Sequence, residues 1–502
     1  MLRTRTLSTR NILRPTTRLQ SCREIRTLAS TYVPELLPHE QEPFDVTTTP
    51  DYTKYHPKIS SISKHLSDLS PYPQHSPYIN PQHYYQNIVL DDWSARKPHP
   101  VSLRQLAAFG KALNEDKIIT SANFVRLELP IRLAIKLKEL QSLPFDVVNN
   151  FHLAKVYESY YDIFDRFRKL SPIKSIEDNT RFCHDLEDVL TDINLLNLPN
   201  LLMGALECCI LDSLPSKKLD ELVSSLLRAR ISRRLILEEH LSLTHNFMKD
   251  PNQSRSHNFI GDIFFKCSAV EHLNISSDNA TKFINKIYPG VKVPKLIIKG
   301  DKDLKFQFLT SHLHYLFGEI LRNCYEATVK TFLASGPGPN DEPFPVEVQV
   351  INNQDHISFR FSDRGGGVTD IKPISKVWSF SKDAELAKLS LSNFHQLPNF
   401  QTLTNSIKST KTMKTLARKS LMQTSVGVLD ENFVKEATLI DLIQRPGEYK
   451  LGLGLAMCKV YADYWNGDLV LHSLSGYGTD TYLKLGKLGA ANHDDKLQLD
   501  RV

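Results

Sequence analysis

The sequence predicts an α-helical bundle followed by an α/β domain. Residues 102 to 270 repeat apolar side chains at steps of three and four and contain only three glycines, which is typical of long packed helices. From about residue 290 the apolar residues alternate instead, which predicts strands. Twelve of the 20 glycines lie between Gly365 and Gly489, in the part of the chain where backbone is expected to approach another group closely.

The first 30 residues have the composition of a mitochondrial transit peptide. They contain seven arginines and one acidic residue, Glu24, so this leader alone carries 7 − 1 = +6. The whole chain has 62 basic and 56 acidic side chains, a net charge of +6, so residues 31 to 502 sum to zero and give no support for a nucleic-acid surface. Arginines interrupt every apolar stretch that a secretory signal would need. We therefore expect import into the mitochondrial matrix. The chain contains no run of about 18 apolar residues, so no membrane-spanning helix is predicted.

Two segments lie between the leader and the α/β domain. Residues 31 to 100 hold eleven of the 27 prolines, which predicts a mostly extended segment because proline blocks helix interiors. The helical bundle is expected over residues 101 to 275. One of its helices is indicated by an apolar stripe formed by Leu153, Val156, Tyr157, Tyr160, Ile163, Phe164 and Phe167.

The α/β domain is expected over residues 290 to 488, with a tail at 489 to 502. Its predicted elements are, in order, a helix at about 308 to 333, strands around 346 to 350 and 357 to 361, a helix at about 452 to 465, and strands at 469 to 474 and 479 to 485. Helices that alternate with strand pairs in this way favour helices packed on a sheet.

Residues that can bind a nucleotide recur along this domain. Glu319 and Asn323 are four residues apart and so share a helix face, where a carboxylate can act as a base beside an amide that holds a metal–phosphate group. The alternative is that Glu319 and Asn323 lie on a solvent-exposed helix face and bind nothing. Asp363 directly follows a predicted strand and precedes three glycines at 365 to 367. Such a turn lets a flat ring approach the backbone, and the carboxylate can accept a hydrogen bond from the exocyclic amine of adenine.

Two glycine motifs complete the set. Gly452 and Gly454 open the helix predicted at 452 to 465, and glycines at a helix N-terminus present free N–H groups to phosphate. Gly476 and Gly478 precede the last predicted strand. The chain contains no GxxxxGK[ST] loop and no HRD or DFG set, which excludes P-loop enzymes and ordinary protein kinases.

In this order the four motifs resemble the GHKL superfamily of ATP-binding domains, which implies an α/β sandwich with a mixed sheet. Within that superfamily the chain is similar to the mitochondrial pyruvate and branched-chain 2-oxo acid dehydrogenase kinases, and a fungal-type member is expected. The similarity rests on residues 124 to 134, 182 to 204 and 461 to 480, and it runs from about residue 100 to 487.

The resemblance assigns roles residue by residue. It implies that Glu319 is the general base and that Asn323 holds Mg²⁺ at the phosphates of ATP. Asp363 would bind the adenine amine, with Thr479 supporting that side. The nucleotide-contacting residues expected on this basis are Glu319, Arg322, Asn323, Glu326, Asp363, Gly365, Gly367, Lys450, Leu451, Gly452, Leu453, Gly454, Leu455 and Thr479.

The chain departs from the family pattern at four places. Asn194 stands where a histidine thought to tune the base is expected. Glu326 replaces a common arginine, which inverts the charge there, and Lys450 replaces the first of three glycines. Residues 383 to 445 make the stretch before Gly452 longer than usual, so we expect an insertion in the ATP lid, and its length predicts mobility.

The resemblance implies a protein-serine kinase that phosphorylates and inactivates the decarboxylase α subunit of the pyruvate dehydrogenase complex. The helical bundle would dock on the lipoyl-bearing acyltransferase core, and a homodimer or a heterodimer with a related kinase is expected. Two alternatives stay open, a kinase of the branched-chain complex and a catalytically weak ATP-binding adaptor. A two-component histidine kinase is disfavoured, because His240 lacks the surrounding phosphoacceptor pattern.

Overall fold

The computed structural model describes most of the helical and α/β regions. The described residues are 87–99, 110, 113–144, 147, 150–192, 197–250, 261, 263–338, 340–369, 371, 373–397, 439, 442, 445 and 449–488. The leader, most of the proline-rich segment, Asn194, the tail and most of the expected lid insertion lie outside these ranges. The predictions made for them therefore stay predictions.

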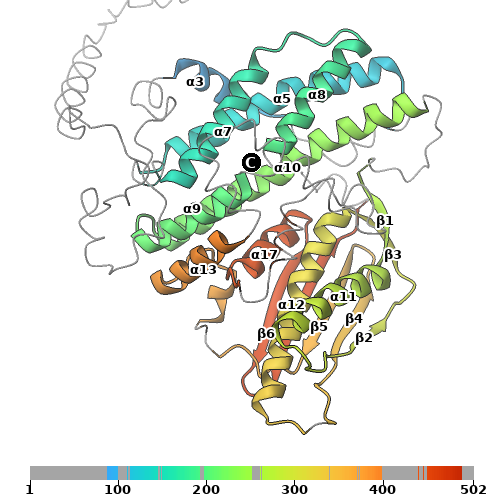
Figure 1. Ribbon diagram of the computed structural model, residues 1–502. Helices are drawn as coiled ribbons and strands as arrows, with labels where there is room; N and C mark the ends of the chain where they lie inside the picture. Colours follow the sequence, from blue (N-terminus) through green and yellow to red (C-terminus); the bar gives the residue numbers. More distant parts are fainter. Residues whose placement is uncertain are drawn as a thin grey trace, which may run out of the picture. The chain divides into compact units, whose positions relative to one another are not determined.

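The first region is helical, as predicted (Figure 1). Its main elements are α3 (Ile88–Ser94), α5 (Glu115–Gln141), α7 (Phe151–Arg168), α8 (Ile176–Asp192), α9 (Leu198–Leu211) and α10 (Ser216–Lys249). Helix α7 begins where the Asn150 side chain accepts hydrogen bonds from the backbone N–H groups of His152 and Leu153. All seven residues of its predicted apolar stripe are buried.

Helix α3 is a short helical stretch inside the segment that was predicted to be mostly extended. Its seven residues contain no proline. The Asn87 side chain caps it by accepting a hydrogen bond from the N–H of Leu90, and Leu90 is fully buried in the core. A local cap and one buried side chain thus outweigh the proline-rich composition around the helix.

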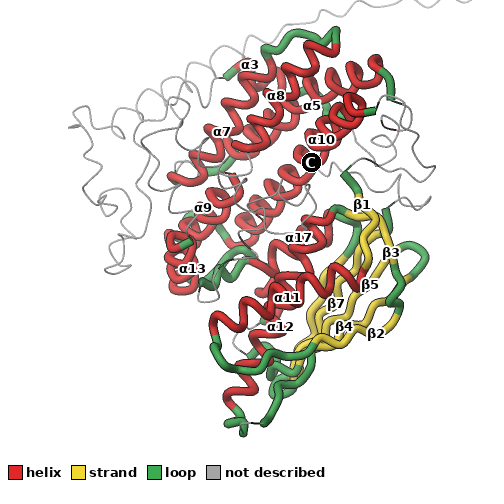
Figure 2. Tube along the Cα trace, turned by 45° about the vertical axis from the view of Figure 1, so that its right-hand side comes forward, coloured by secondary structure: helices red, strands yellow, loops and turns green. Residues whose placement is uncertain are grey.

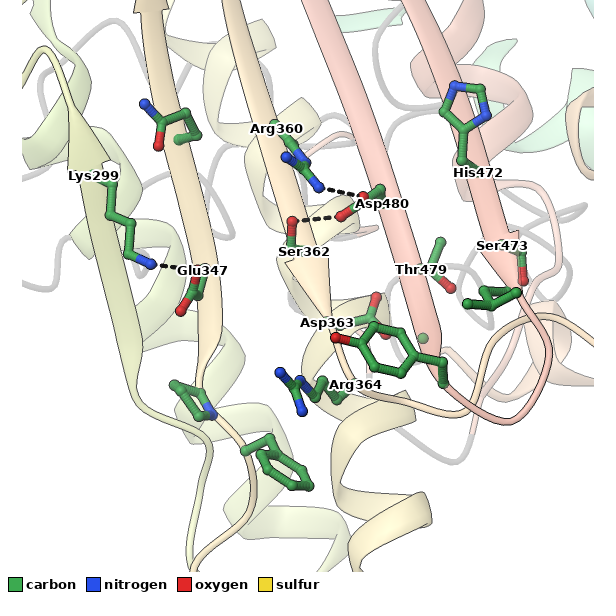
Figure 3. A pocket seen from close by; sticks show the side chains of 16 residues that line it. Lys299, Glu347, Arg360, Ser362, Asp363, Arg364, His472, Ser473, Thr479 and Asp480 are labelled. Carbon is green, nitrogen blue, oxygen red and sulfur yellow. Dashed lines mark hydrogen bonds and ion pairs between the residues drawn. The ribbon is translucent and has the colours of Figure 1, made fainter.

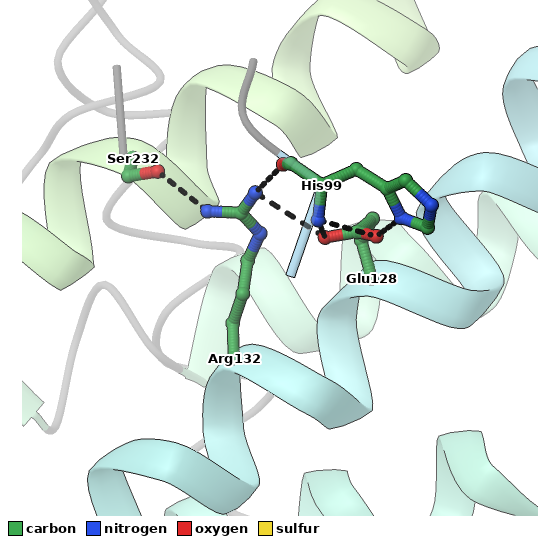
Figure 4. A network of polar contacts seen from close by, with 4 residues as sticks. All are labelled: His99, Glu128, Arg132 and Ser232. Carbon is green, nitrogen blue, oxygen red and sulfur yellow. Dashed lines mark hydrogen bonds and ion pairs between the residues drawn. The ribbon is translucent and has the colours of Figure 1, made fainter. Parts of the chain in front are cut away.

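A buried arginine joins two helices of this region. Arg132 on α5 donates hydrogen bonds to Ser232 Oγ on α10 and to the carbonyl oxygen of His99, over 3.3 and 2.8 Å (Figure 4). Glu128, one turn earlier on α5, lies 3.3 Å from the same guanidinium and accepts from the backbone N–H of His99. This network ties the chain before α5 to the bundle.

The α/β region contains a mixed five-stranded sheet in the order β2-β4-β5-β7-β6. Its strands are β2 (Leu296–Gly300), β4 (Val346–Asn352), β5 (His356–Asp363), β6 (Asp468–Leu474) and β7 (Gly478–Gly486). The β2 and β4 strands are parallel and the other neighbours are antiparallel. A separate antiparallel pair is formed by β1 (Phe265–Ser268) and β3 (Lys305–Phe308). The predicted strands and the mixed sheet are confirmed.

Helices α11 (Ala269–Ile287), α12 (Thr310–Ala334) and α17 (Gly454–Tyr464) pack on one face of the sheet (Figure 2). Alternate residues of β5 point into this layer, and Phe359 packs edge-on against Phe317 of α12, with ring centroids 4.8 Å apart. Both side chains are completely buried. The two predicted helices of this domain, α12 and α17, are therefore set by burial of their apolar stripes against the sheet.

The expected lid insertion starts as ordered structure, which corrects the prediction of a mobile segment from residue 383 onward. After a short 3₁₀ helix, η5 (Ile374–Trp378), helix α13 spans Ala384–Gln396 and packs along α9 of the helical region (Figure 1). Ala387, Leu391 and Phe394 on α13 are fully buried. The apolar residues of α13 are spaced three and four apart, which favours a helix, whereas the length of the stretch before Gly452 had suggested an irregular loop.

Candidate active site

Helix α12 carries the two residues expected to catalyse and to hold metal, and it exposes them differently. Glu319 is 1% exposed, whereas Asn323 one turn later is exposed to solvent. The shared face predicted from their spacing is therefore present, but only the amide is open to a ligand.

The Glu319 carboxylate is enclosed by Arg445, the last residue of the expected lid insertion, and by Gly454, which follows it. Its Oε2 lies 3.0 Å from Arg445 Nη2, its Oε1 accepts from Arg445 Nη1, and Arg445 itself is buried. On the other side, a Cβ at Gly454 would overlap the carboxylate, so any other residue there would displace it. Burial alone would raise the pKa of Glu319, but the Arg445 guanidinium outweighs it and the pKa lies below its usual range.

Arg445 was not among the residues expected from the sequence. It lies within the stretch interpreted as a lid insertion, 126 residues after its partner, and no local motif marks it. The buried neighbours Leu439 and Leu442 lie in the same stretch. Only packing of this segment against α12 brings the guanidinium to the carboxylate.

The expected adenine end of the site lies at the end of β5. Asp363 is 6% exposed, and its Oδ1 accepts a hydrogen bond of 2.9 Å from the backbone N–H of Gly365. Thr479 is its register partner on β7. Burial raises the pKa of Asp363, although the backbone donor at Gly365 opposes this. A Cβ at Gly365 would overlap Ala327 of α12, so the turn rests directly on the helix that carries Glu319.

A cavity of about 750 Å³ opens beside Asp363 and extends along the sheet face away from the helices (Figure 3). Asp363 and Thr479 line its edge, but most of its lining comes from strand residues such as Lys299, Glu347 and Arg360. The residues expected to contact phosphate, on α12 and on the glycine loop, do not line it. This cavity therefore meets the expected nucleotide site only at the adenine end.

The glycine loop at 450 to 455 leads into α17. Leu451 and Leu453 are buried and anchor the loop, whereas Gly452 is exposed and has a φ of +67°, and Leu455 lies in the first turn of α17. The Asn393 side chain of α13 donates a hydrogen bond of 2.7 Å to the carbonyl oxygen of Lys450. The N-cap residue of α17, Leu453, has no side chain that can cap the helix, so in the described residues the first N–H groups of α17 can bind an anion.

Two of the four departures from the family pattern meet as an ion pair. Lys450 Nζ lies 2.7 Å from Glu326 Oε1, and Lys330 Nζ approaches the same oxygen at 2.7 Å. Burial would raise the pKa of Glu326, but the two lysines outweigh it and lower the pKa. The structure thus places the ionised Glu326, whose charge is balanced by two lysines, next to the glycine loop, with the exposed Lys450 beside it.

Arg322 and Gly367 are the remaining expected residues, and the charge of Arg322 also helps to lower the pKa of Glu319. The Arg322 guanidinium is buried over the ring of Phe283 on α11, 3.8 Å from its centroid. Gly367 packs against Ser473 and Leu474 at the end of β6. The structure therefore brings the expected residues together in two groups, around Asp363 and around the glycine loop, and turns Arg322 into the interior.

His240 is buried in the helical region, where it contacts the side chains of two other helices. Its ring nitrogens lie 3.0 Å from Ser121 Oγ and 3.0 Å from Asn179 Oδ1, and it is 1% exposed. Burial lowers its pKa to about 4. A phosphoacceptor must be accessible, so this geometry argues against a two-component histidine kinase.

A helical region followed by a mixed sheet with helices on one face is the fold of a GHKL-type kinase. The chain is 46% identical over 482 residues, 91% of its own length and 96% of the relative's, to "[Pyruvate dehydrogenase (acetyl-transferring)] kinase 2, mitochondrial" of Saccharomyces cerevisiae. It belongs to the family of mitochondrial pyruvate dehydrogenase kinases. The fungal-type expectation agrees with this relative.

More distant relatives cover most of the chain as well. A pyruvate dehydrogenase kinase of Arabidopsis thaliana is 27% identical, covering 79% of this chain and 93% of its own, and human isozyme 4 is 26% identical, covering 80% and 84%. A family model described as "Mitochondrial branched-chain alpha-ketoacid dehydrogenase kinase" matches residues 100–264. In the described ranges, no helix is both long enough and apolar enough to cross a membrane.

Proposed function

We propose that this protein is a protein-serine kinase of the mitochondrial matrix that transfers the γ-phosphate of ATP to the decarboxylase α subunit of the pyruvate dehydrogenase complex and inactivates it. The observation that carries the proposal is the order of groups along α12. A buried carboxylate at Glu319, an exposed amide at Asn323 and the Asp363 turn resting on Ala327 follow one another along one helix.

The spacing along α12 suits a nucleotide lying lengthwise. Eight residues separate Glu319 from Ala327, and a rise of 1.5 Å per residue puts them roughly 12 Å apart along the helix axis. Adenine at Asp363 would then direct its phosphates toward Gly452 and Gly454. The terminal phosphate would arrive near Glu319, because Gly454 contacts that carboxylate.

In the proposed reaction a Glu319 oxygen accepts the proton of the substrate serine. The serine oxygen bonds to the γ-phosphorus while the bond to the bridging β–γ oxygen breaks, and ADP leaves. The exposed amide oxygen of Asn323 suits Mg²⁺, which takes hard oxygen ligands, and Mg²⁺ when bound neutralises charge on the phosphates.

Glu319 can act as base only after Arg445 releases it, because the guanidinium engages both carboxylate oxygens. Release has a second consequence. Without the arginine, burial dominates and raises the pKa of Glu319, which makes the carboxylate a stronger base. The resting site is therefore closed, and substrate binding must compete with an internal ion pair.

The proposed partners follow from the same family. We expect the helical bundle to dock on the lipoyl-bearing acyltransferase core, which raises the local substrate concentration. We also expect a homodimer or a heterodimer with a related kinase. The sheet face away from the helices supports this, because Phe344, Leu474 and Tyr477 expose between 52% and 64% of their surface there.

A kinase of the branched-chain complex is the second candidate, and the name of the family model that matches residues 100–264 favours it. The relative that covers 91% of the chain is named for pyruvate dehydrogenase, so the pyruvate complex ranks first.

The test is incubation of the purified protein with each complex and labelled ATP. We expect label on the decarboxylase α subunit of the pyruvate complex, loss of that complex's activity, and at most slow labelling of the branched-chain complex. Reversed rates would make the second candidate correct. ATP binding without transfer to either complex would support the adaptor instead.

A further inference from the structure

The glycine loop is tied to helix α12 through its first residue. Lys450, which replaces a glycine of the family pattern, places its Nζ 2.7 Å from Oε1 of Glu326 on α12. The Glu326 side chain is 13% exposed and the Lys450 side chain is 54% exposed. Because water screens a largely buried carboxylate less than a solvated one, this contact is stronger than an ordinary surface ion pair.

The backbone of the same residue is held by a second helix. The carbonyl oxygen of Lys450 accepts a hydrogen bond of 2.7 Å from Asn393 Nδ2 on α13, and the next residue, Leu451, is buried. Two residues after Lys450 the loop is open, because a Cβ placed on Gly452 would meet no described atom closer than 3.5 Å. The loop is therefore anchored at its start and free at the turn that is expected to face phosphate.

A second lysine contacts the same carboxylate but belongs to the same helix. Lys330 Nζ lies 2.7 Å from Glu326 Oε1, and Lys330 follows Glu326 by one turn of α12. One carboxylate therefore faces two ammonium groups, which leaves the cluster with a surplus of 2 − 1 = +1. This surplus offsets the repulsion that a lone Glu326 would exert on phosphate at the neighbouring loop.

We propose that the ion pair between Lys450 and Glu326 is a latch that holds the glycine loop on α12 and so positions its N–H groups for the phosphates of the nucleotide. The inference rests on the proposal that this loop binds ATP. Both residues are positioning residues, because they act through the loop and do not need to touch the phosphates.

The latch has a consequence for nucleotide exchange. A glycine at position 450 would leave the start of the loop free to move, since glycine has the largest backbone freedom. With Lys450 in its place, the ion pair must break before the loop can move away from α12. Loop opening often limits product release in enzymes, so we expect the latch to slow the departure of ADP.

The test is stopped-flow release of a fluorescent, ribose-labelled ADP from the full chain. Lys450→Met removes the ammonium and keeps most of the aliphatic chain. It should speed ADP release about two- to fivefold, the range for an ion pair with one exposed partner. A release rate equal to that of the wild type would reject the latch. A wild type that binds no ADP would instead overturn the proposed function, so the two failures are distinguishable.

Lys330→Met is the matched control, because it takes one ammonium from the same carboxylate and leaves the link between loop and helix in place. Its release rate should stay close to that of the wild type. If Lys330→Met speeds release as much as Lys450→Met, the effect comes from the total charge of the cluster and the latch is rejected.

A double-mutant cycle separates the latch from a direct contact between Lys450 and the nucleotide. Glu326→Gln removes the partner of Lys450 and should itself speed release. Lys450→Met should then have little further effect in the Glu326→Gln background, because the pair is already broken. Equal effects of Lys450→Met in both backgrounds would mean that Lys450 acts without Glu326, and the latch would be rejected.

Discussion

The two ends of the proposed nucleotide site are built in different ways. At the adenine end, Asp363 and Thr479 are neighbours in the sheet register, and a backbone N–H already orients the carboxylate. At the transfer end, Glu319 is enclosed by Arg445, which comes from a segment 126 residues away. The comparison teaches that the carboxylate proposed to bind adenine is already oriented by the backbone, whereas the carboxylate proposed as the base is held by a side-chain contact that must break before it can act.

The largest expected effect lies at the transfer end. Glu319→Gln keeps the shape of the side chain and loses the base, so phosphoryl transfer should fall by about 10²- to 10⁴-fold while ATP affinity changes little. Single-turnover phosphorylation measured beside ATP binding checks this. Asn323→Ala is the contrasting variant, because it should lose Mg-ATP affinity as well as turnover. A Glu319→Gln enzyme that transfers phosphate at the wild-type rate would remove Glu319 from the mechanism.

The next effect lies at the adenine end. Asp363→Ala removes the carboxylate placed for the adenine amine and should weaken ATP binding by about 10²-fold, in line with a hydrogen bond to a charged group. Circular dichroism should be unchanged, since the sheet register does not depend on this side chain. Unaltered ATP affinity in calorimetry would show that the Asp363 turn is not the adenine site.

Arg445 allows the restrained end to be loosened directly. Arg445→Gln should speed phosphorylation at about pH 8 by roughly two- to tenfold, the equivalent of one or two net hydrogen bonds. The pKa of Glu319 should rise, because burial is no longer opposed, so the acid limb of the pH–rate profile should shift to higher pH. Arg445→Lys keeps the charge and serves as control. An unchanged profile in Arg445→Gln would mean that the ion pair does not restrain the base.

The last expected effect is on stability rather than on catalysis. The pKa of Glu319 is lower in the folded protein than its ordinary value, so its ion pair contributes stability above that ordinary value and loses it as the pH falls through the folded pKa. Wild type and Glu319→Gln should differ most in free energy of unfolding near neutral pH, by about 3 kcal/mol. Urea unfolding should show this difference narrowing below about pH 4. A difference that does not vary with pH would contradict the ionised pair.

Much of the architecture could be predicted because it depends on local pattern. The strands of the sheet, α12 and α17 follow from apolar periodicity, which records which face of each element is buried. Helix α3 was not predicted, because the many prolines around it indicated an extended segment. Helix α13 was not predicted, because the unusual length of the stretch before Gly452 was interpreted as a mobile loop. In both cases a short amphipathic stretch was present but its packing partner was not visible in the sequence.

The sequence by itself determined the order of chemical groups, from Glu319 through Asp363 to the glycine loop, because those roles depend on residue type and short spacing. Only the tertiary structure decided which charges act on them. Arg445 with Glu319 and Lys450 with Glu326 are ion pairs between distant segments. Electrostatic contacts depend on separations of a few ångströms in space. The sequence between two charged residues does not indicate whether the fold brings them that close.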